Sequence, residues 1–349
     1  MILNIIQAIY GLILLLVLFI LIKWLYFFLI KLFGNVKSFL GVMIEGSEKY
    51  WVWRWQNTHK NKKISYENID KYHPIRGWTL VPNLKNKLHY AATINSNSKG
   101  TRGLTRESSK NKTLFFGDSF CFGEGVDDQE TISAFFEKSF KNTQAINLGI
   151  HGYGVDQQYL YLKEKISEYK PERVCFVITD NDFRRNFMNF RDFAKPKFSL
   201  IDNKITLTNT PVPKPEEISH SKISFYSLFF ELIKHFLIFY GIIGKRKRIL
   251  ISNYILDNIK EETDKHNAEL IFIYINDVRR GAWYRSYIDK YFINYFRKRK
   301  IKYLYLEGIY GKKNLLSMFD TLSGHLSSDG NKSVAEKLAE SIKSRKTQK

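Results

Sequence analysis

From residue 113 onward, the chain alternates short apolar runs with longer segments whose apolar residues recur at helical spacing. The short runs predict strands and the segments between them predict helices, because the two structures have different side-chain periods. Strands separated by helices are typical of a parallel sheet covered on both faces. We therefore predict an α/β fold, a flavodoxin-like three-layer sandwich that binds ligands at the carboxyl ends of its strands. The predicted strands are 113–117, 144–149, 173–179, 269–275 and 301–306, and the predicted helices are 129–141, 155–168, 284–299 and 329–345.

The N-terminal segment has a different pattern. Residues 2–22 carry no charge, and only Asn4, Gln7 and Gly11 interrupt their apolar character. A helix of this length crosses a hydrocarbon core of about 30 Å. The run has no basic start and no small-residue cleavage site before Lys23, which disfavours a cleaved signal peptide. We predict a retained, single-pass N-terminal transmembrane helix.

The orientation of this anchor stays open. Lysine residues follow the span and none precedes it, which by the positive-inside rule favours a cytoplasmic main domain. A single span with aromatic flanks is weak ground for such a rule, so both membrane faces remain possible locations.

The pattern divides the chain into three parts. Residues 1–34 form the transmembrane anchor and an interfacial helix, residues 35–110 form a linker and short strands that frame a site, and residues 111–349 form the α/β domain. An insertion around 184–250 interrupts that domain. In the middle part, alternating tryptophans suit either a strand or an interfacial contact; they are Trp51, Trp53 and Trp55.

Two stretches of the insertion have a pattern of their own. Residues 198–207 alternate in polarity, which predicts a small hairpin. Residues 223–243 are apolar and aromatic, with Glu231, Lys234 and His235 among them, and a basic cluster at 245–248 follows. The charges disfavour a second span, so this segment is either an amphipathic helix against the bilayer or the active site, or a plain core helix.

Composition narrows the function classes. The chain of 349 residues is 44% apolar, which supports a real core, and has a formal charge of +21. That charge indicates either anionic partners or basic faces that are simply solvated. Because the sequence has no helix-turn-helix, zinc-finger or RNP-like motif, the charge does not indicate nucleic-acid binding. The two cysteines, Cys121 and Cys175, lie in apolar runs and are expected to be buried thiols without a disulfide or metal role.

The stretch from Thr113 to Gly123 carries the first candidate chemistry. An apolar run breaks into Gly117-Asp118-Ser119 and then into a helical pattern. This puts a serine hydroxyl at the carboxyl end of a strand and beside a helix N-terminus, where backbone N–H groups can receive negative charge. Taken alone, the same turn could be an ordinary helix cap.

Three further blocks follow in order, and the four together resemble the SGNH or GDSL-type hydrolase superfamily, in a membrane-anchored branch. The resemblance spans residues 73–342. It implies Ser119 as nucleophile, His325 as base, and the Ser119 N–H, Gly152 N–H and Asn181 amide as oxyanion-hole donors. His325 also stands in a turn-rich loop just before a helix expected to be capped near Ser327 or Ser328. The further blocks are Asn147–Gly154, Thr179–Asp182 and His325–Gly330.

The sequence departs from this family at the third triad position. The usual aspartate lies three residues before the histidine, and here that place holds Leu322. Asp320, five residues before His325, is the candidate for the role; otherwise a backbone carbonyl, or no group, orients the imidazole. Asp182 is expected to orient its loop and not to carry a proton. The glycines of the second block lack dinucleotide-binding spacing.

The resemblance implies a membrane-anchored serine hydrolase that cleaves carboxylic O-acyl esters through an acyl-serine intermediate. Its partner would be an ester-bearing lipid or glycan at a membrane, and no metal or organic cofactor is implied. Two alternatives stay open. One is an O-acyltransferase or O-acetylesterase acting on envelope glycans, and the other is a non-catalytic membrane scaffold with the same fold, which Leu322 supports best. Nothing in the sequence indicates the oligomeric state.

Overall fold

A computed structural model describes the greater part of the chain. The described residues are 10, 11, 13–15, 17, 18, 20, 21, 24, 47–58, 69–104, 111–140, 142–214, 217, 225–239, 242–275, 287–305, 316–320 and 323–346.

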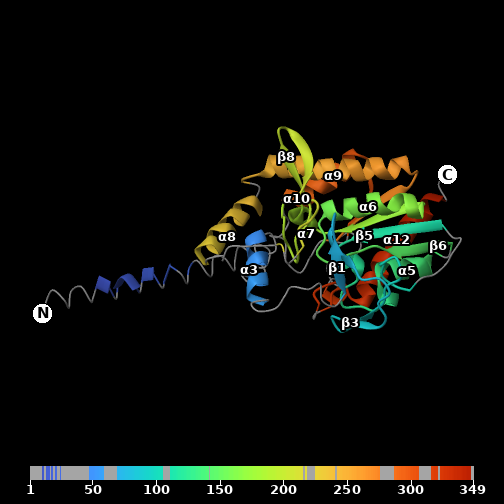
Figure 1. Cartoon of the computed structure of the whole chain (residues 1–349), viewed down its shortest axis with the longest axis horizontal. Coiled ribbons are helices and arrows are strands. Elements are labelled where there is room, and N and C mark those ends of the chain that lie inside the picture. Colours follow the sequence, from blue (N-terminus) through green and yellow to red (C-terminus); the bar gives the residue numbers. More distant parts are fainter. Residues whose placement is uncertain are drawn as a thin grey trace.

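A five-stranded parallel sheet forms the centre of the fold (Figure 1). Its order is β11-β10-β7-β5-β6, and every neighbouring pair is parallel. Numbered along the chain, this order is 2-1-3-4-5, the flavodoxin-like arrangement that the sequence predicts. The strands are β5 (Asn111–Gly117), β6 (Thr143–Asn147), β7 (Arg173–Ile178), β10 (Glu269–Tyr274) and β11 (Lys302–Tyr305).

Helices cover both faces of the sheet, which confirms the three-layer prediction. On one face, α6 (Val155–Tyr169), α9 (Lys245–Lys265) and α10 (Tyr287–Lys298) contribute to the larger hydrophobic cluster. On the other face, α5 (Ile132–Ser139) and α12 (Ser328–Lys346) build the second cluster. The central strand β7 is buried along its whole length, as expected when a parallel sheet is covered on both sides.

Two antiparallel hairpins precede the sheet and belong to the same core. They are β1 (Asp70–His73) with β2 (Gly77–Leu80), and β3 (Lys87–His89) with β4 (Ala92–Ile94). Trp78 is fully buried in the larger cluster and its Nε1 donates a hydrogen bond to the His151 carbonyl, 3.0 Å away. The short strands expected in 35–110 therefore pack into the same hydrophobic core as the parallel sheet.

Arg76 joins the first hairpin to α6. Its Nε donates to Glu164 Oε2 at 3.0 Å, its Nη1 donates to the Tyr153 hydroxyl at 2.9 Å, and its guanidinium stacks 3.7 Å from the centre of the Tyr161 ring. Burial opposes the charge of Glu164, but a hydrogen bond from His73 and the charge of Arg76 outweigh it and lower the pKa of Glu164 to about 2. This cluster fixes the loop after β6 against the hairpin.

The insertion contains a hairpin and two helices. β8 (Lys197–Ile201) and β9 (Lys204–Thr208) form the hairpin that the alternation predicts. It is tied to the core by Lys195, whose Nζ lies 2.5 Å from Asp156 Oδ2 with both side chains fully buried. α8 (Phe225–Phe239) matches the apolar 223–243 segment, and the basic cluster after it forms the first turn of α9. α9 lies outside the predicted helices, because its buried positions are spaced among many charges.

The described part of the N-terminal region is helical. α3 (Glu48–Thr58) contains the tryptophan cluster, so the strand interpretation of that cluster is wrong: Trp51 packs with Met188 and Phe190 on one side of a helix, while Trp53 is exposed. Most of the expected anchor, residues 2–22, lies outside the described residues. Among those that are described, no helix combines the length and the apolar character that crossing a membrane requires.

Candidate active site

Ser119 stands where the sequence analysis places it, directly after β5 and at the start of the short helix α4 (Ser119–Phe122). Asp118 caps this helix, since its Oδ1 accepts the Phe120 N–H at 2.9 Å. The loop after β6 packs against α4 at Gly149, where an added Cβ would lie 2.4 Å from the Phe122 nitrogen. The strand, turn and helix predicted from 113–123 are confirmed.

His325 meets Ser119 across 206 positions of sequence, with its Nε2 2.7 Å from the serine Oγ. The histidine lies in the loop before α12, and Ser327 caps that helix by accepting the Gly330 N–H at 3.2 Å. The Phe120 ring packs on the imidazole, with centroids 4.9 Å apart. The two groups expected to act as nucleophile and base are therefore in hydrogen-bond contact.

Asp320 does not complete a triad in this arrangement. Its Oδ2 accepts the Ser323 N–H at 2.5 Å, and its own N–H donates to the His325 carbonyl at 2.8 Å, so it stabilises the turn that carries the histidine. Nδ1 of His325 is buried and has no hydrogen-bond partner within the described part of the chain. Leu322, which occupies the usual aspartate position, lies outside the described residues.

Glu124 is the carboxylate that lies against the dyad, with Oε2 3.2 Å from Nε2 of His325. Arg102 holds the loop of Glu124, because its guanidinium donates to the carbonyls of Phe122, Gly123 and Val126. Burial opposes the charge of Glu124, but neighbouring imidazoles, led by His89, outweigh it and lower its pKa to about 2. Sequence reasoning missed this residue, although an acid between two glycines just after the serine helix was visible.

Two further histidines stand beside Glu124. His89 Nε2 lies 3.8 Å from Glu124 Oε1, and His151 Nε2 lies 3.0 Å from Asp70 Oδ2. Burial opposes protonation of His151, but Asp70 and then Glu124 outweigh it and raise its pKa to about 9. The β3–β4 hairpin brings His89 to the site, because this residue ends β3.

The expected oxyanion donors follow β6 and β7, the two strands that flank β5 in the sheet. Gly152 lies in the loop after β6 and has φ +75°, a conformation that favours glycine. A Cβ there would also meet Asp192 Oδ2 at 2.4 Å, so this side chain would have to move to admit any other residue. Asn181 is in the first turn of α7 (Asp180–Arg185), and its Oδ1 is buried without a partner among the described residues.

Arg185 connects three of the four sequence blocks. Its Nη1 donates to Asp118 Oδ2 at 3.0 Å, to Asp182 Oδ1 at 2.9 Å and to the Tyr153 carbonyl at 3.1 Å. Burial and the neighbouring Asp118 carboxylate raise the pKa of Asp182. Asp182 also accepts the Thr179 N–H and hydroxyl, which fits the loop-orienting role expected for it.

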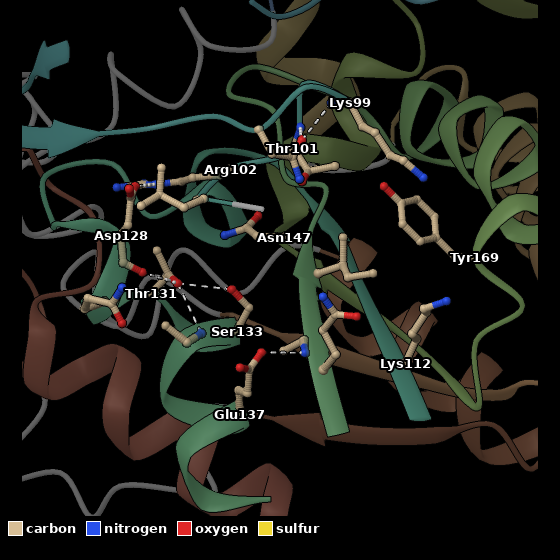
Figure 2. A pocket seen from close by; sticks show the side chains of 18 of the residues that line it. Lys99, Thr101, Arg102, Lys112, Asp128, Thr131, Ser133, Glu137, Asn147 and Tyr169 are labelled. Carbon is tan, nitrogen blue, oxygen red and sulfur yellow. Dashed lines mark hydrogen bonds and ion pairs between the residues drawn. The ribbon is translucent and has the colours of Figure 1, made fainter. Parts of the chain in front are cut away.

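A cavity of about 500 Å³ opens beside β6 (Figure 2). Its lining includes Lys99, Arg102, Asp128 and Tyr169, but neither Ser119 nor His325. Figure 2 shows Arg102 pointing toward Asp128, with Nε 3.0 Å from Oδ1. This cavity is therefore distinct from the dyad.

Comparison with known proteins gives structural neighbours only. The chain matches no protein-family model and no curated protein. Similar solved structures include a lipase/acylhydrolase from Enterococcus faecalis, with 14% identity and a TM-score of 0.41 over 67% of this chain and 96% of that one. A member of the lipolytic G-D-S-L family from Veillonella parvula has 11% identity and a TM-score of 0.39 over 66% of this chain and 96% of that one.

A third similar structure is a catalytic mutant of an acetylxylan esterase from Geobacillus stearothermophilus. Its identity is 13% and its TM-score 0.40, over 68% of this chain and 96% of that one. Scores of this size carry no argument about activity, which has to follow from the geometry at Ser119.

Proposed function

We propose that this protein is a serine hydrolase of the SGNH type that cleaves carboxylic O-acyl esters through an acyl-Ser119 intermediate. The observation that carries the proposal is the 2.7 Å contact between the Ser119 Oγ and His325 Nε2. A serine hydroxyl is a weak nucleophile until an adjacent base takes its proton, and a contact of this length is within the reach that the transfer requires.

The reaction has two stages. As Oγ forms a bond to the ester carbonyl carbon, its proton passes to Nε2 of His325, and the carbonyl oxygen becomes an oxyanion. The Ser119 N–H, the Gly152 N–H and the Asn181 amide are the proposed donors to that oxygen. The C–O bond to the alcohol then breaks, and His325 returns the proton to the leaving oxygen. In the second stage, water attacks the acyl carbon and gives a proton to His325, and the bond from the acyl carbon to the Ser119 Oγ breaks. His325 returns the proton to Oγ, and the carboxylic acid is released.

Glu124 is the proposed charge partner of the base. When Nε2 takes the proton the ring becomes cationic, and a buried carboxylate 3.2 Å from that nitrogen stabilises it. Asp320 makes no hydrogen bond to the imidazole, since Nδ1 of His325 has no partner among the described residues, and its carboxylate accepts from the backbone of its own turn. The proposal therefore replaces the expected Ser-His-Asp triad by a dyad supported by Glu124.

A fluorophosphonate probe tests the nucleophile. Full-length protein should be labelled on one serine, and Ser119→Ala should abolish labelling. Ser199→Ala, on the β8–β9 hairpin, is the matched control and should label as wild type. Folded wild-type protein that stays unlabelled would instead support the non-catalytic scaffold. A series of p-nitrophenyl esters then ranks the acyl lengths that the site accepts.

We also propose that the N-terminal segment anchors the enzyme in a membrane, where an ester-bearing lipid or glycan would be its substrate. The described residues between 10 and 24 are helical and expose large apolar side chains; examples are Tyr10, Leu14, Leu15, Leu21 and Trp24. Full-length protein should stay in the membrane fraction after carbonate washing, and a chain lacking residues 1–46 should not. Recovery of both in the soluble fraction would exclude the anchor, and protease protection would assign the membrane face.

A further inference from the structure

Two imidazoles and one carboxylate converge next to the dyad, with one ligand-type atom from each of His89, Glu124 and His151 within 4.8 Å of the others. The proposed ester chemistry uses neither histidine. We propose that these three residues bind one divalent transition-metal ion, of which Zn²⁺ is the best match. Two histidines and one glutamate are a ligand set that zinc accepts, and imidazole suits this class of ion better than it suits Mg²⁺ or Ca²⁺.

One of the atoms that face this point lacks a hydrogen-bond partner in the part of the chain that the structure describes. His89 Nε2 is buried and makes no hydrogen bond to any described residue, although it lies only 3.8 Å from Glu124 Oε1. Buried polar atoms are normally satisfied, so an unpartnered imidazole nitrogen beside a buried carboxylate calls for a third group between them. A cation coordinated by both would satisfy each of them.

The surroundings of the cluster resemble the support that metal ligands usually have. Asp70 Oδ2 contacts the His151 ring at 3.0 Å, and a carboxylate behind an imidazole fixes its orientation and makes it a better ligand. The Arg102 bonds hold the loop of Glu124 in place. Two of the three ligands are thus set by the fold before any ion arrives.

The distances require one small adjustment. Ligand atoms in a tetrahedral zinc site are about 3.4 Å apart, so the widest separation here must close by about 1 Å or slightly more. His89 can supply this movement, because it ends the short edge strand β3 and its side chain is 20% exposed. Three protein ligands leave one coordination position open to water or another oxygen ligand.

Glu124 would connect the ion to the dyad through its two oxygens. Oε1 faces His89, whereas Oε2 faces His325. An ion on the first oxygen would draw charge from the carboxylate that supports the base, so bound metal would change turnover without touching Ser119. The site itself does not depend on ester chemistry, and it exists whether or not Ser119 is a nucleophile.

The test measures binding to full-length protein that has been treated with a chelator and dialysed. Calorimetric titration with Zn²⁺, and visible absorption on titration with Co²⁺, should give one bound ion per chain with a Kd of about 1 µM or below. His89→Gln and His151→Gln should each weaken binding by at least about 10-fold, and Asp70→Asn by about 10- to 100-fold. Ser119→Ala should bind as wild type.

His266→Gln is the matched control. His266 is a surface histidine at the end of α9 that contacts Ser167, so its loss should leave binding unchanged. Thermal melting of each metal-free variant checks that it is folded. The proposal is overturned if the wild type binds no stoichiometric ion, or if folded His89→Gln and His151→Gln bind as tightly as the wild type.

Discussion

Replacing Arg185 by Met should destabilise the protein by several kcal/mol, about 3–5. The guanidinium is 5% exposed and bridges two carboxylates, Asp118 and Asp182, that are themselves almost completely buried. Breaking a buried ion pair by removing one partner costs about 3–5 kcal/mol. The total stability of a domain is only about 5–15 kcal/mol. Met retains most of the apolar stem, so the change isolates the loss of charge and hydrogen bonds.

The pH dependence of this loss follows from the two carboxylates. Without Arg185 the pKa of Asp182 rises further above its unfolded value of about 3.9, so the folded state binds a proton more readily than the unfolded state. The loss of unfolding free energy caused by Arg185→Met should therefore be largest at neutral pH and should become smaller as the pH falls toward 5. Urea denaturation followed by tryptophan fluorescence measures it at each pH.

A second substitution separates the charge argument from simple loss of packing. Asp182→Asn in the Arg185→Met background removes one of the stranded charges, and should recover about 1–3 kcal/mol as a coupling between contacting residues. The reasoning is refuted if Arg185→Met costs less than about 1 kcal/mol at neutral pH, the floor for a side chain with buried hydrogen bonds. It is equally refuted if the double variant is no more stable than Arg185→Met alone.

Three further changes test the site and its support. In an ester assay of chelator-treated protein, Asp320→Asn should keep kcat/KM within about 3-fold of the wild type, whereas Glu124→Gln should lower it by about 10-fold or more. The opposite ranking would identify Asp320 as the partner of the base. Lys195→Met strands the buried Asp156 carboxylate and should cost about 3–5 kcal/mol in urea denaturation, so a loss below 1 kcal/mol contradicts the pairing. Glu164→Gln should lower the free energy of unfolding at pH 7. The difference from wild type should fade as the pH falls from about 4.3 to about 2, because a carboxyl group with a lowered pKa in the folded state adds stability only while it is ionised. A difference that does not depend on pH would exclude the ionic contribution.

The sheet could be predicted from sequence because its signals are local. Each strand is a short apolar run, and the helices between the strands indicate that they are parallel. The same reasoning failed for α3, where Trp51 and Trp55 share a helical face but also fit a two-residue period. It also failed for α9, whose buried positions are outnumbered by charges.

The site could be predicted only where its residues stand in recognisable blocks. Ser119 and His325 follow from block order, and the structure brings them into contact. Glu124 and His89 could not be found in this way, since their importance comes from burial that the β3–β4 hairpin creates. Asp320 was chosen by its distance along the chain from His325, whereas the geometry of the turn directs its carboxylate to the backbone.

The placement of Trp78, Leu80 and Ile94 inside the main core determines where the chain can be shortened from its N-terminal end. A truncation that begins at the serine block would remove these side chains and leave the helix α6 with an open apolar surface. A cut upstream of Ile69 would release a unit that keeps both hairpins, the histidines and the nucleophile. A shortened chain that is meant to keep this core should therefore begin on the N-terminal side of that residue.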